Sequence, residues 1–213
     1  KNGNKWELME PDFMELKQLF QKWQMGMERG DGWNALFWCN HDQPRIVSRL
    51  GSEGKYWKES AKMLAGMIHF MRGTPYIYQG EEIGMTNPHY TSIEQYKDVE
   101  SLNYYKILLQ EGKTSVQALK ILAARSRDNS RTPMQWTDSK NYGFSQAEPW
   151  LSVSDNISKI NVSSQQKDES SILSFYKKLI VLRKEKKLIS KGKIEFLENE
   201  NKNVLAYKRT WAD

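Results

Sequence analysis

The 213-residue sequence is poor in residues that build cross-links and soft metal sites. One cysteine excludes an internal disulfide framework, and three scattered histidines make no zinc site with it. No apolar run is long enough to cross a membrane. The chain also lacks an initiator methionine and the charged-then-apolar leader of a secreted protein. We therefore expect a cytoplasmic chain without a metal centre.

Aromatic content, by contrast, is high. At 12% of residues it exceeds what a disordered chain carries, and the length suits one domain, or one domain and part of another. The sequence opens in a polar stretch at Lys1 and stops at Asp213, directly after a strand-like run. We expect both ends to be internal positions of a larger protein.

The net charge of +6 is concentrated in one segment. Residues 172–193 hold eight basic side chains and one acidic one, a net +7, so the rest of the chain is close to neutral at about −1. A nucleic-acid binder would combine such a patch with base-stacking aromatic residues or a reader motif, and neither is present. We interpret the segment as a solvated helix face and expect no nucleic-acid partner. Its basic residues are Lys177, Lys178, Arg183, Lys184, Lys186, Lys187, Lys191 and Lys193.

Hydrophobic periodicity in the first part of the chain predicts alternating helices and strands. A helical pattern starts after Pro11, a residue favoured at the first helical position, and is broken at Gly30. Residues 33–39 are typical of a strand buried on both faces, residues 60–70 of a well-covered helix and residues 76–78 of a second strand. Such alternation with short links indicates a parallel sheet.

The rest of the chain departs from this alternation. Residues 98–110 and 115–125 predict two helices inserted after the second strand, and a further amphipathic helix begins at Ile172. Residues 193–197 and 203–209 flank a polar stretch and predict a hairpin that opens a separate β domain. Polar, irregular segments are expected over residues 127–136 and 152–171.

Acidic side chains follow both predicted strands. Asp42 comes after the first strand, beside His41, and Glu81 and Glu82 come after the second. In a parallel α/β barrel, functional groups lie at the carboxyl ends of the strands. An ionised carboxylate next to a neutral imidazole can accept and donate hydrogen bonds to neighbouring sugar hydroxyls. On these two residues alone, a turn with a helix-capping Asp42 explains the pair equally well.

Three longer strings around these residues resemble one family, the α-amylase superfamily of glycoside hydrolases. Residues 33–45 are similar to its seventh barrel strand with the Asn-His-Asp loop, and residues 73–85 to the eighth strand with its loop. Residues 126–136 resemble the pocket-bordering segment of the branch that holds the oligo-1,6-glucosidases and phosphotrehalases.

The resemblance implies an α/β fold. Residues 1–190 would be the C-terminal portion of a catalytic (β/α)8 TIM barrel, about strands seven and eight with their helices, including a helical insert at about 98–150. Residues 191–213 would open a C-terminal antiparallel β domain. Two strands cannot close an eight-stranded barrel, so the missing N-terminal part of the barrel is an expected partner of this chain.

The same resemblance implies catalytic roles. Retaining members use an Asp nucleophile after the fourth strand and a Glu acid/base after the fifth, and both would lie upstream of Lys1. The family's third acidic residue maps onto Asp42, which with His41 would stabilise the transition state through the sugar hydroxyls. We expect the 213-residue chain alone to be inactive. No cofactor is implied, and any calcium site would lie in the missing part.

Four further residues are implied to bind substrate. Arg127 is the favoured partner of the terminal glucose and Arg131 the alternative, and each would otherwise hold the loop in a structural ion pair. Lys5 would hold a substrate phosphate, or else is an ordinary exposed lysine. Glu81 would meet the leaving sugar or, with Glu82, fix its own loop through backbone N–H groups.

Within the branch the resemblance is closest to the phosphotrehalases, on residues 5–8 and on Cys39 at the end of the first strand. It implies a retaining α-glucosidase that hydrolyses trehalose 6-phosphate to glucose and glucose 6-phosphate. The alternatives are an oligo-1,6-glucosidase and a non-catalytic amylase-like scaffold. The substrate would be a small disaccharide or disaccharide phosphate, with no membrane partner. Cys39 is expected to be a small buried hydrophobe, and His69, Arg45 and Arg49 to be structural.

Overall fold

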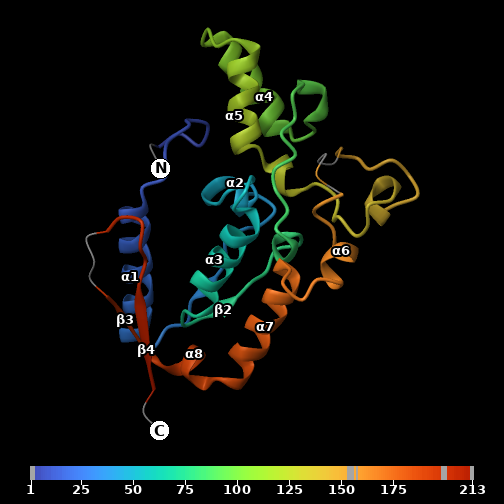
Figure 1. Ribbon diagram of the computed structural model, residues 1–213. Helices are drawn as coiled ribbons and strands as arrows, with labels where there is room; N and C mark the ends of the chain where they lie inside the picture. The colour runs from blue at the N-terminus through green and yellow to red at the C-terminus, as the bar shows by residue number, and fades with distance from the viewer. Residues whose placement is uncertain (1–2, 153–155, 157, 198–200, 212–213) are drawn as a thin grey trace. The chain divides into compact units, whose positions relative to one another are not determined.

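The structure is a computed structural model that describes residues 3–152, 156, 158–197 and 201–211 (Figure 1). Helices and strands are mixed along the chain. The helices are α1 (Phe13–Arg29), α2 (Ile46–Leu50), α3 (Trp57–His69), α4 (Val99–Gln110), α5 (Ser115–Arg125), α6 (Val162–Gln166), α7 (Ile172–Glu185) and α8 (Lys187–Lys191). The strands are β1 (Ala35–Leu36), β2 (Thr74–Pro75), β3 (Lys193–Phe196) and β4 (Tyr207–Thr210). Short 3-10 helices are η1 (Glu81–Ile83), η2 (Ile93–Gln95), η3 (Arg127–Ser130) and η4 (Lys140–Gly143).

The chain folds into two compact units. The first comprises Lys1–Met9, Trp38–Leu64 and Ile77–Phe175, and the second comprises Glu10–Phe37, Ala65–Tyr76 and Tyr176–Asp213. All the site residues expected from the sequence belong to the first unit. No helix among the residues described is long and apolar enough to cross a membrane.

In the second unit, α1 begins because Asp12 caps it. The Asp12 carboxylate accepts hydrogen bonds from the backbone N–H groups of Met14 and Glu15, at 2.8 and 3.1 Å. The helix starts after Pro11, as predicted, because the acceptor side chain of the next residue, Asp12, caps it. The expected break at Gly30 is confirmed, since Gly30 follows the last helical residue.

Strands β1 and β2 pair in parallel, as predicted, but both are shorter than predicted. The pairing begins with Ala35 opposite Thr74 and covers two residues on each strand. The second strand therefore immediately precedes the predicted 76–78. Gly73 makes this register possible: a Cβ at that position would lie 2.4 Å from the Asn34 carbonyl oxygen, so only glycine permits the close approach.

The expectation that residues 33–39 are buried on both faces is wrong. Trp33 and Phe37 are 46% and 49% exposed, whereas Leu36 is 5% exposed. A strand is buried on both faces only when a layer of structure covers each of them. Among the described residues β1 pairs with one strand, β2, and the side chains on one side stay uncovered.

Strands β3 and β4 form the predicted antiparallel hairpin, with Lys193 opposite Thr210. Of the polar stretch between them, residues 198–200 lie outside the described residues. Strand β3 packs along α1 within the second unit (Figure 1). The assignment of residues 191–213 to a separate β domain stays a prediction.

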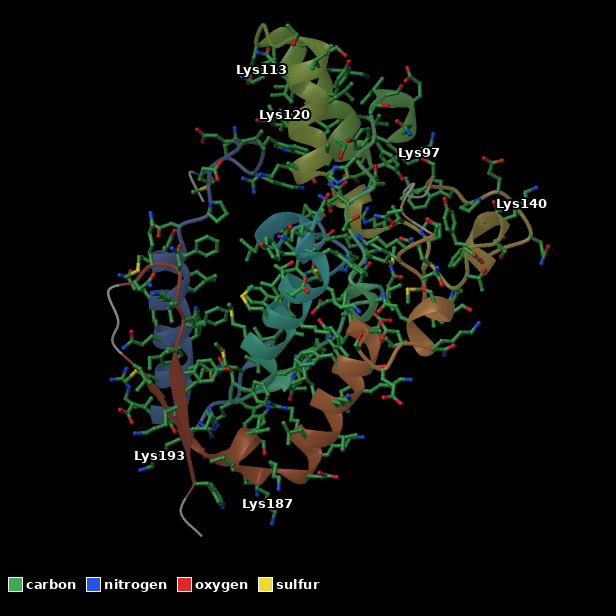
Figure 2. All side chains as sticks on the ribbon, viewed as in Figure 1. Lys97, Lys113, Lys120, Lys140, Lys187 and Lys193 are labelled. Atoms are coloured by element: carbon green, nitrogen blue, oxygen red, sulfur yellow. The ribbon has the colours of Figure 1, made fainter. Side chains whose placement is uncertain are left out.

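All lysines of the basic segment, residues 172–193, are exposed to solvent, as the sequence predicts. Figure 2 shows Lys187 and Lys193 pointing away from the ribbon. Arg183 is the exception, because its guanidinium donates to the carbonyl oxygens of His69 and Met71 at 2.6 and 2.9 Å. Arg183 therefore ties α7 to the end of α3 within the second unit.

In the first unit, the predicted helices over 98–110 and 115–125 are α4 and α5, which lie side by side (Figure 1). A turn at Gly112 joins them. Thr114 and Gln117 form a capping box at the start of α5, with bonds of 2.9 and 3.2 Å. The buried hydrophobic cluster around the two helices contains Trp6, Tyr90, Tyr96, Leu108, Ala118, Ile121, Leu122 and Leu151.

Trp6 anchors the N-terminal segment to α4. It is 4% exposed, and its ring stacks on that of Tyr104 with centroids 4.8 Å apart. The burial of this large apolar ring fixes the neighbouring residue, Lys5, beside the first turn of α4.

The segment expected to be irregular over residues 152–171 contains one short helix, α6. Asn161 caps it, since its side-chain oxygen accepts the Ser164 N–H at 2.8 Å. Residues 153–155 and 157 of this segment lie outside the described residues. Helix α7 begins at Ile172, as predicted.

Candidate functional site

Asp42 and His41 lie on the loop that follows β1, as the sequence predicts. Asn40 shapes this loop, because its side-chain oxygen accepts the Asp42 N–H at 2.8 Å. The imidazole Nε2 of His41 lies 3.3 Å from Oδ2 of Asp42. The Asp42 side chain is 46% exposed and the His41 side chain 70% exposed, so both are accessible to a bound molecule.

Two arginines approach the Asp42 carboxylate. Arg131 Nη2 lies 2.8 Å from Asp42 Oδ1, and Arg131 Nε donates to the His41 carbonyl oxygen at 2.9 Å. Arg127 Nη1 lies 3.8 Å from the same Oδ1 atom. The sequence favoured Arg127 and kept Arg131 as the alternative, and the structure brings both to Asp42, with Arg131 the closer.

A buried carboxylate, that of Asp98, holds the same two arginines. Its oxygens accept Arg127 Nε and Nη2 at 3.0 and 2.7 Å, a bidentate pair, and Arg131 Nη1 lies 3.7 Å from Oδ1. Burial raises the pKa of Asp98, but the hydrogen bonds and charge of Arg127, with the charge of Arg131, outweigh it and hold this pKa below its ordinary value. The hydrogen bond to Asp98 in turn raises the pKa of Arg127.

Lys5 joins these residues through Glu100. Its Nζ lies 2.6 Å from Glu100 Oε2, and the same oxygen lies 3.2 Å from Arg127 Nε. The ammonium also lies 4.7 Å from the ring centroid of Trp6. Lys5 is therefore held by neighbours rather than free in solvent. We call the set the Asp42 cluster: Lys5, Asp42, Asp98, Glu100, Arg127 and Arg131.

The polar segment after α5 runs into the interior of the first unit. Asp128 and Asn129 are fully buried, at 0% exposure. Asp128 Oδ2 accepts the backbone N–H groups of Lys97 and Asp98 at 2.8 and 2.9 Å. The Asn129 amide donates to the Ala123 carbonyl oxygen at 3.0 Å. Because these polar groups have partners inside the protein, the short helix η3 holds Arg127, and Arg131 directly after it, in place.

Arg45 fixes the neighbouring loops. It is 1% exposed, and its guanidinium donates to the Gln79 carbonyl oxygen and, at 3.3 Å, to Thr132 Oγ1. The Tyr78 hydroxyl donates to the Ser130 carbonyl oxygen at 3.1 Å. These contacts confirm the structural role expected for Arg45.

Glu81 and Glu82 form η1, after β2. Glu81 is 4% exposed, so its carboxylate faces the interior of the first unit rather than open space. Burial raises the pKa of Glu82, against the lowering effect of backbone N–H groups, including that of Gly80. This placement favours the alternative in which both side chains fix their own loop.

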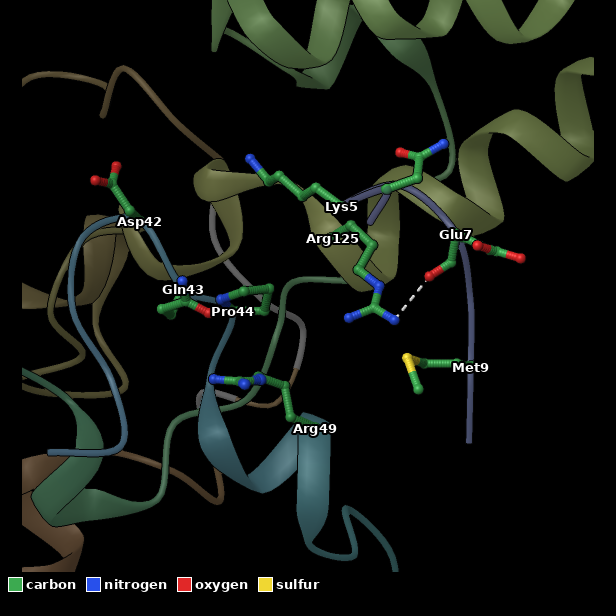
Figure 3. Close-up of a pocket in the computed structure, with 9 residues that line it drawn as sticks. Lys5, Glu7, Met9, Asp42, Gln43, Pro44, Arg49 and Arg125 are labelled. Atoms are coloured by element: carbon green, nitrogen blue, oxygen red, sulfur yellow. Dashed lines mark hydrogen bonds between the residues drawn. The ribbon is translucent and has the colours of Figure 1, made fainter. Parts of the chain in front are cut away.

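A cavity of about 140 Å³ opens between the N-terminal segment and the Asp42 loop (Figure 3). Figure 3 shows Arg125 donating to the Glu7 carbonyl oxygen, a bond of 2.9 Å. Arg49 lines the same cavity, and burial, with the positive charge of Arg125, lowers the pKa of Arg49. The lining is Asn4, Lys5, Glu7, Met9, Asp42, Gln43, Pro44, Arg49 and Arg125.

Sequence reasoning missed Asp98, Glu100 and Arg125. The only sequence signal for the first two is the pair of acidic residues at the start of α4, which equally fits helix capping and the helix dipole. Arg125 ends α5, where a basic residue is favoured at any helix C-terminus. None of the three has a local pattern that distinguishes a site residue from a helix-end residue.

The sequence also predicted the surroundings of Cys39 and His69. No group of three or more His, Cys, Asp or Glu side chains that could hold a metal ion occurs in the described part of the chain. Cys39 is buried, as expected, and its Sγ accepts the Ile46 N–H at 3.1 Å. His69 is also buried, as expected, with Nδ1 placed 2.8 Å from the Ala65 carbonyl oxygen.

Comparison with known proteins places the chain beside carbohydrate-active enzymes. Residues 1–192 match the family described as alpha amylase, catalytic domain. The chain is 54% identical over 209 residues to trehalose-6-phosphate hydrolase of Escherichia coli (strain K12). It is 50% identical over 205 residues to probable oligo-1,6-glucosidase 2 of Bacillus subtilis (strain 168). These alignments cover 98% and 96% of this chain but 38% and 36% of the two relatives.

A solved structure is similar over the whole chain. Trehalose-6-phosphate hydrolase from Bacillus licheniformis superposes with a TM-score of 0.95 at 52% identity. The match covers 100% of this chain and 38% of that chain. The chain therefore spans well under half the length of the proteins that it matches.

Proposed function

Because this chain belongs to the α-amylase catalytic-domain family, we propose that it is part of a retaining α-glucosidase that hydrolyses trehalose 6-phosphate to glucose and glucose 6-phosphate. The observation that carries the proposal is the Asp42 cluster, in which a half-exposed carboxylate lies between two arginines and beside a cavity that Lys5 lines. The 54% identity to a trehalose-6-phosphate hydrolase supports the choice of substrate.

Asp42 and His41 act on the reacting sugar. The Asp42 carboxylate accepts hydrogen bonds from the hydroxyls next to the reacting carbon, and the imidazole of His41 contributes beside it. Positive charge and ring flattening develop at that carbon in the oxocarbenium-like transition state, and such contacts then strengthen by several kcal/mol. Interactions that strengthen in this way raise kcat rather than ground-state affinity.

The substrate phosphate binds at the cationic side of the cavity. Lys5, Arg49 and Arg125 all line it, and an ammonium and two guanidinium groups are natural partners of a phosphate dianion. Lys5 meets the phosphate by exchanging its contact with Glu100. Glu100 keeps Arg127 as a partner when this happens, so no carboxylate is left unpaired.

The nucleophile and the acid/base lie outside this chain. In retaining glycosidases these two carboxylates stand about 5–5.5 Å apart, and in this family they follow the fourth and fifth barrel strands. We place β1 and β2 as the seventh and eighth strands of the (β/α)8 barrel and the β3–β4 hairpin as the start of a C-terminal β domain. The 213-residue chain alone is then inactive, and the rest of the barrel is its partner. The reaction needs no cofactor, and the enzyme works in the cytoplasm.

An oligo-1,6-glucosidase is the second candidate, favoured by the 50% identity to a probable member of that group. The two candidate functions differ in the substrate that the intact protein should hydrolyse. The intact protein should hydrolyse trehalose 6-phosphate well and isomaltose poorly, with retention at the anomeric carbon followed by NMR. A clear preference for isomaltose contradicts the phosphotrehalase proposal. Turnover of neither sugar favours a non-catalytic scaffold.

The role of Asp42 has a matched control in Asp168. The two side chains are 46% and 43% exposed. Each forms an ion pair, Asp42 with Arg131 and Asp168 with Lys58 at 2.9 Å. Asp42→Ala in the intact protein should abolish turnover, and Asp168→Ala should retain it. Equal activity of the two variants contradicts the assignment of Asp42. Turnover by the purified 213-residue chain contradicts the placement of the nucleophile and acid/base elsewhere.

A further inference from the structure

Asp98 occupies the N-cap position of α4, yet its carboxylate does not cap the helix. An N-cap aspartate ordinarily accepts a backbone N–H of the first turn. Asp98 instead gives both oxygens to Arg127, at 3.0 and 2.7 Å, and is 4% exposed on its side chain. The buried Asp98 carboxylate therefore binds the Arg127 guanidinium in place of a backbone N–H, and its contacts fix the position of that guanidinium.

The two arginines that Asp98 contacts are the two that contact Asp42. Arg127 bridges the two carboxylates through Nη2 at 2.7 Å from Asp98 and Nη1 at 3.8 Å from Asp42. Arg131 bridges them through Nη1 at 3.7 Å from Asp98 and Nη2 at 2.8 Å from Asp42. We propose that Asp98 is a positioning residue: its buried carboxylate clamps Arg127 and Arg131, and these arginines orient the Asp42 carboxylate toward the substrate.

Asp98 is itself rigidly held. Its backbone N–H donates to Asp128 Oδ2 at 2.9 Å, and the Ser101 hydroxyl donates to its Oδ2 at 3.3 Å. Ser101 in turn shares a hydrogen bond of 2.7 Å with Ser126, at the end of α5. The arginine side of the clamp holds the Asp98 pKa below its ordinary value, so the carboxylate stays ionised at neutral pH. Asp98 is therefore fixed in position and negatively charged when it binds the two arginines.

The clamp has a kinetic consequence, which rests on the proposed function. Without the negative charge of Asp98, the remaining carboxylate partners among the described residues are Asp42 for both arginines and Glu100 for Arg127, and the arginines move toward those groups. The Asp42 carboxylate then shifts and its oxygens become more fully occupied by guanidinium. Because Asp42 acts mainly in the transition state, kcat falls while KM changes little. A displacement of about 1 Å in such a group costs on the order of 100-fold in rate.

Steady-state kinetics of the intact protein test the clamp. Asp98→Asn keeps the shape of the side chain and removes its charge, and should lower kcat for trehalose 6-phosphate about 10- to 100-fold with KM within about threefold. Asp98→Glu keeps the charge and moves it by about one bond, 1.5 Å, and should lower kcat by about tenfold. The control Asp168→Asn breaks an ion pair of the same unit and should keep the wild-type kcat.

The outcomes are distinguishable. A wild-type kcat in a folded Asp98→Asn or Asp98→Glu variant overturns the clamp, and so does a kcat loss that Asp168→Asn reproduces. If thermal unfolding shows that Asp98→Asn does not fold, the kcat of Asp98→Glu alone tests the clamp. A wild-type protein that hydrolyses neither sugar refutes the proposed function instead. A crystal structure of the Asn variant then tests the geometry: Arg127 Nη1 should move closer to Asp42 Oδ1 than the present 3.8 Å, and an unchanged distance overturns the proposal.

Discussion

Arg131 holds Asp42 from two sides, across 89 residues of sequence. Its Nη2 pairs with the Asp42 carboxylate at 2.8 Å, while its Nε bonds the carbonyl oxygen of His41 at 2.9 Å. One guanidinium group thus fixes both the side chain of Asp42 and the backbone that carries it. The planar fork of an arginine holds both acceptors in a fixed geometry, whereas the donors of a lysine ammonium rotate freely.

Removing this fork should slow the reaction. Arg131→Gln in the intact protein should lower kcat on trehalose 6-phosphate on the order of 100-fold, because Asp42 loses both the ion pair and the support of its loop. Steady-state kinetics measure the effect. Arg29→Gln is the control, since Arg29 is exposed and bonds only the Met25 carbonyl oxygen among the contacts described. A loss below threefold for Arg131→Gln contradicts the role.

Removing the Lys5 ammonium should discriminate between substrates. Lys5→Met should lower kcat/KM for trehalose 6-phosphate about 10- to 100-fold, because a hydrogen bond to a charged group contributes about 1.5–3 kcal/mol. Turnover of an unphosphorylated disaccharide should change little. Lys113→Met is the matched control, since Lys113 lies at the exposed tip of the α4–α5 pair (Figure 2). An equal loss on both sugars contradicts a phosphate role for Lys5.

The single cysteine should be inert in the folded protein. Burial raises the pKa of the Cys39 thiol to about 12, with the negative charge of Glu81 adding to the effect. At about pH 8 only on the order of one thiol in 10⁴ is then ionised, and the thiolate is the reactive form. A chromogenic disulfide reagent should label Cys39 only after addition of denaturant. Rapid labelling of protein with a native circular dichroism spectrum contradicts this.

The two histidines His69 and His89 should titrate on opposite sides of 6.5. Burial lowers the pKa of His69, and the charge of Arg183 adds to this. The hydrogen bond to Glu53, at 2.6 Å, raises the pKa of His89. NMR titration of the protein labelled at histidine should give a midpoint below 6.5 for His69 and above 6.5 for His89. Variants His69→Gln and His89→Gln assign the two signals.

The directions of these two pKa shifts also determine how the stability of the folded protein depends on pH. The unfolded chain protonates His69 near 6.5 and the folded chain only at lower pH, so stability falls as pH drops from about 6.5 toward the folded pKa. For His89 the folded pKa lies above 6.5, so its contribution is complete below that pH and is lost as pH rises through the folded value. Unfolding curves of the two Gln variants should therefore diverge from the wild type in opposite pH directions.

The predicted site residues that the structure brings together lie in short contiguous strings. His41 with Asp42, and Arg127 with Arg131, lie within a few positions of each other, so a short stretch of sequence defines each pair. The helices over 98–110 and 115–125 were also predictable, because Gly112 marks the turn between them and Thr114 caps the start of the second. Local patterns are enough for such features.

The features that the sequence did not predict depend on contacts between distant segments. Asp98 meets Arg127 only because the α4–α5 pair folds back on itself over 29 residues. The short extent of β1 and the exposure of Trp33 and Phe37 depend on which structure lies over the sheet, which alternation of apolar residues does not specify. Glu81 follows a strand, as a site residue would, but the turn of η1 directs it into the interior.

The α4–α5 pair meets the Asp42 cluster at one end only. Helix α4 starts beside Asp98, α5 finishes two residues before Arg127, and the turn at Gly112 closes the far, exposed end. Adding or removing one turn in both helices, about 3.6 residues each, would move that tip by about 5.4 Å and leave the charged residues at the base where they are. The length of the pair can therefore vary, and the exposed turn at Gly112 is a suitable position for inserting a tag or an additional module into the protein.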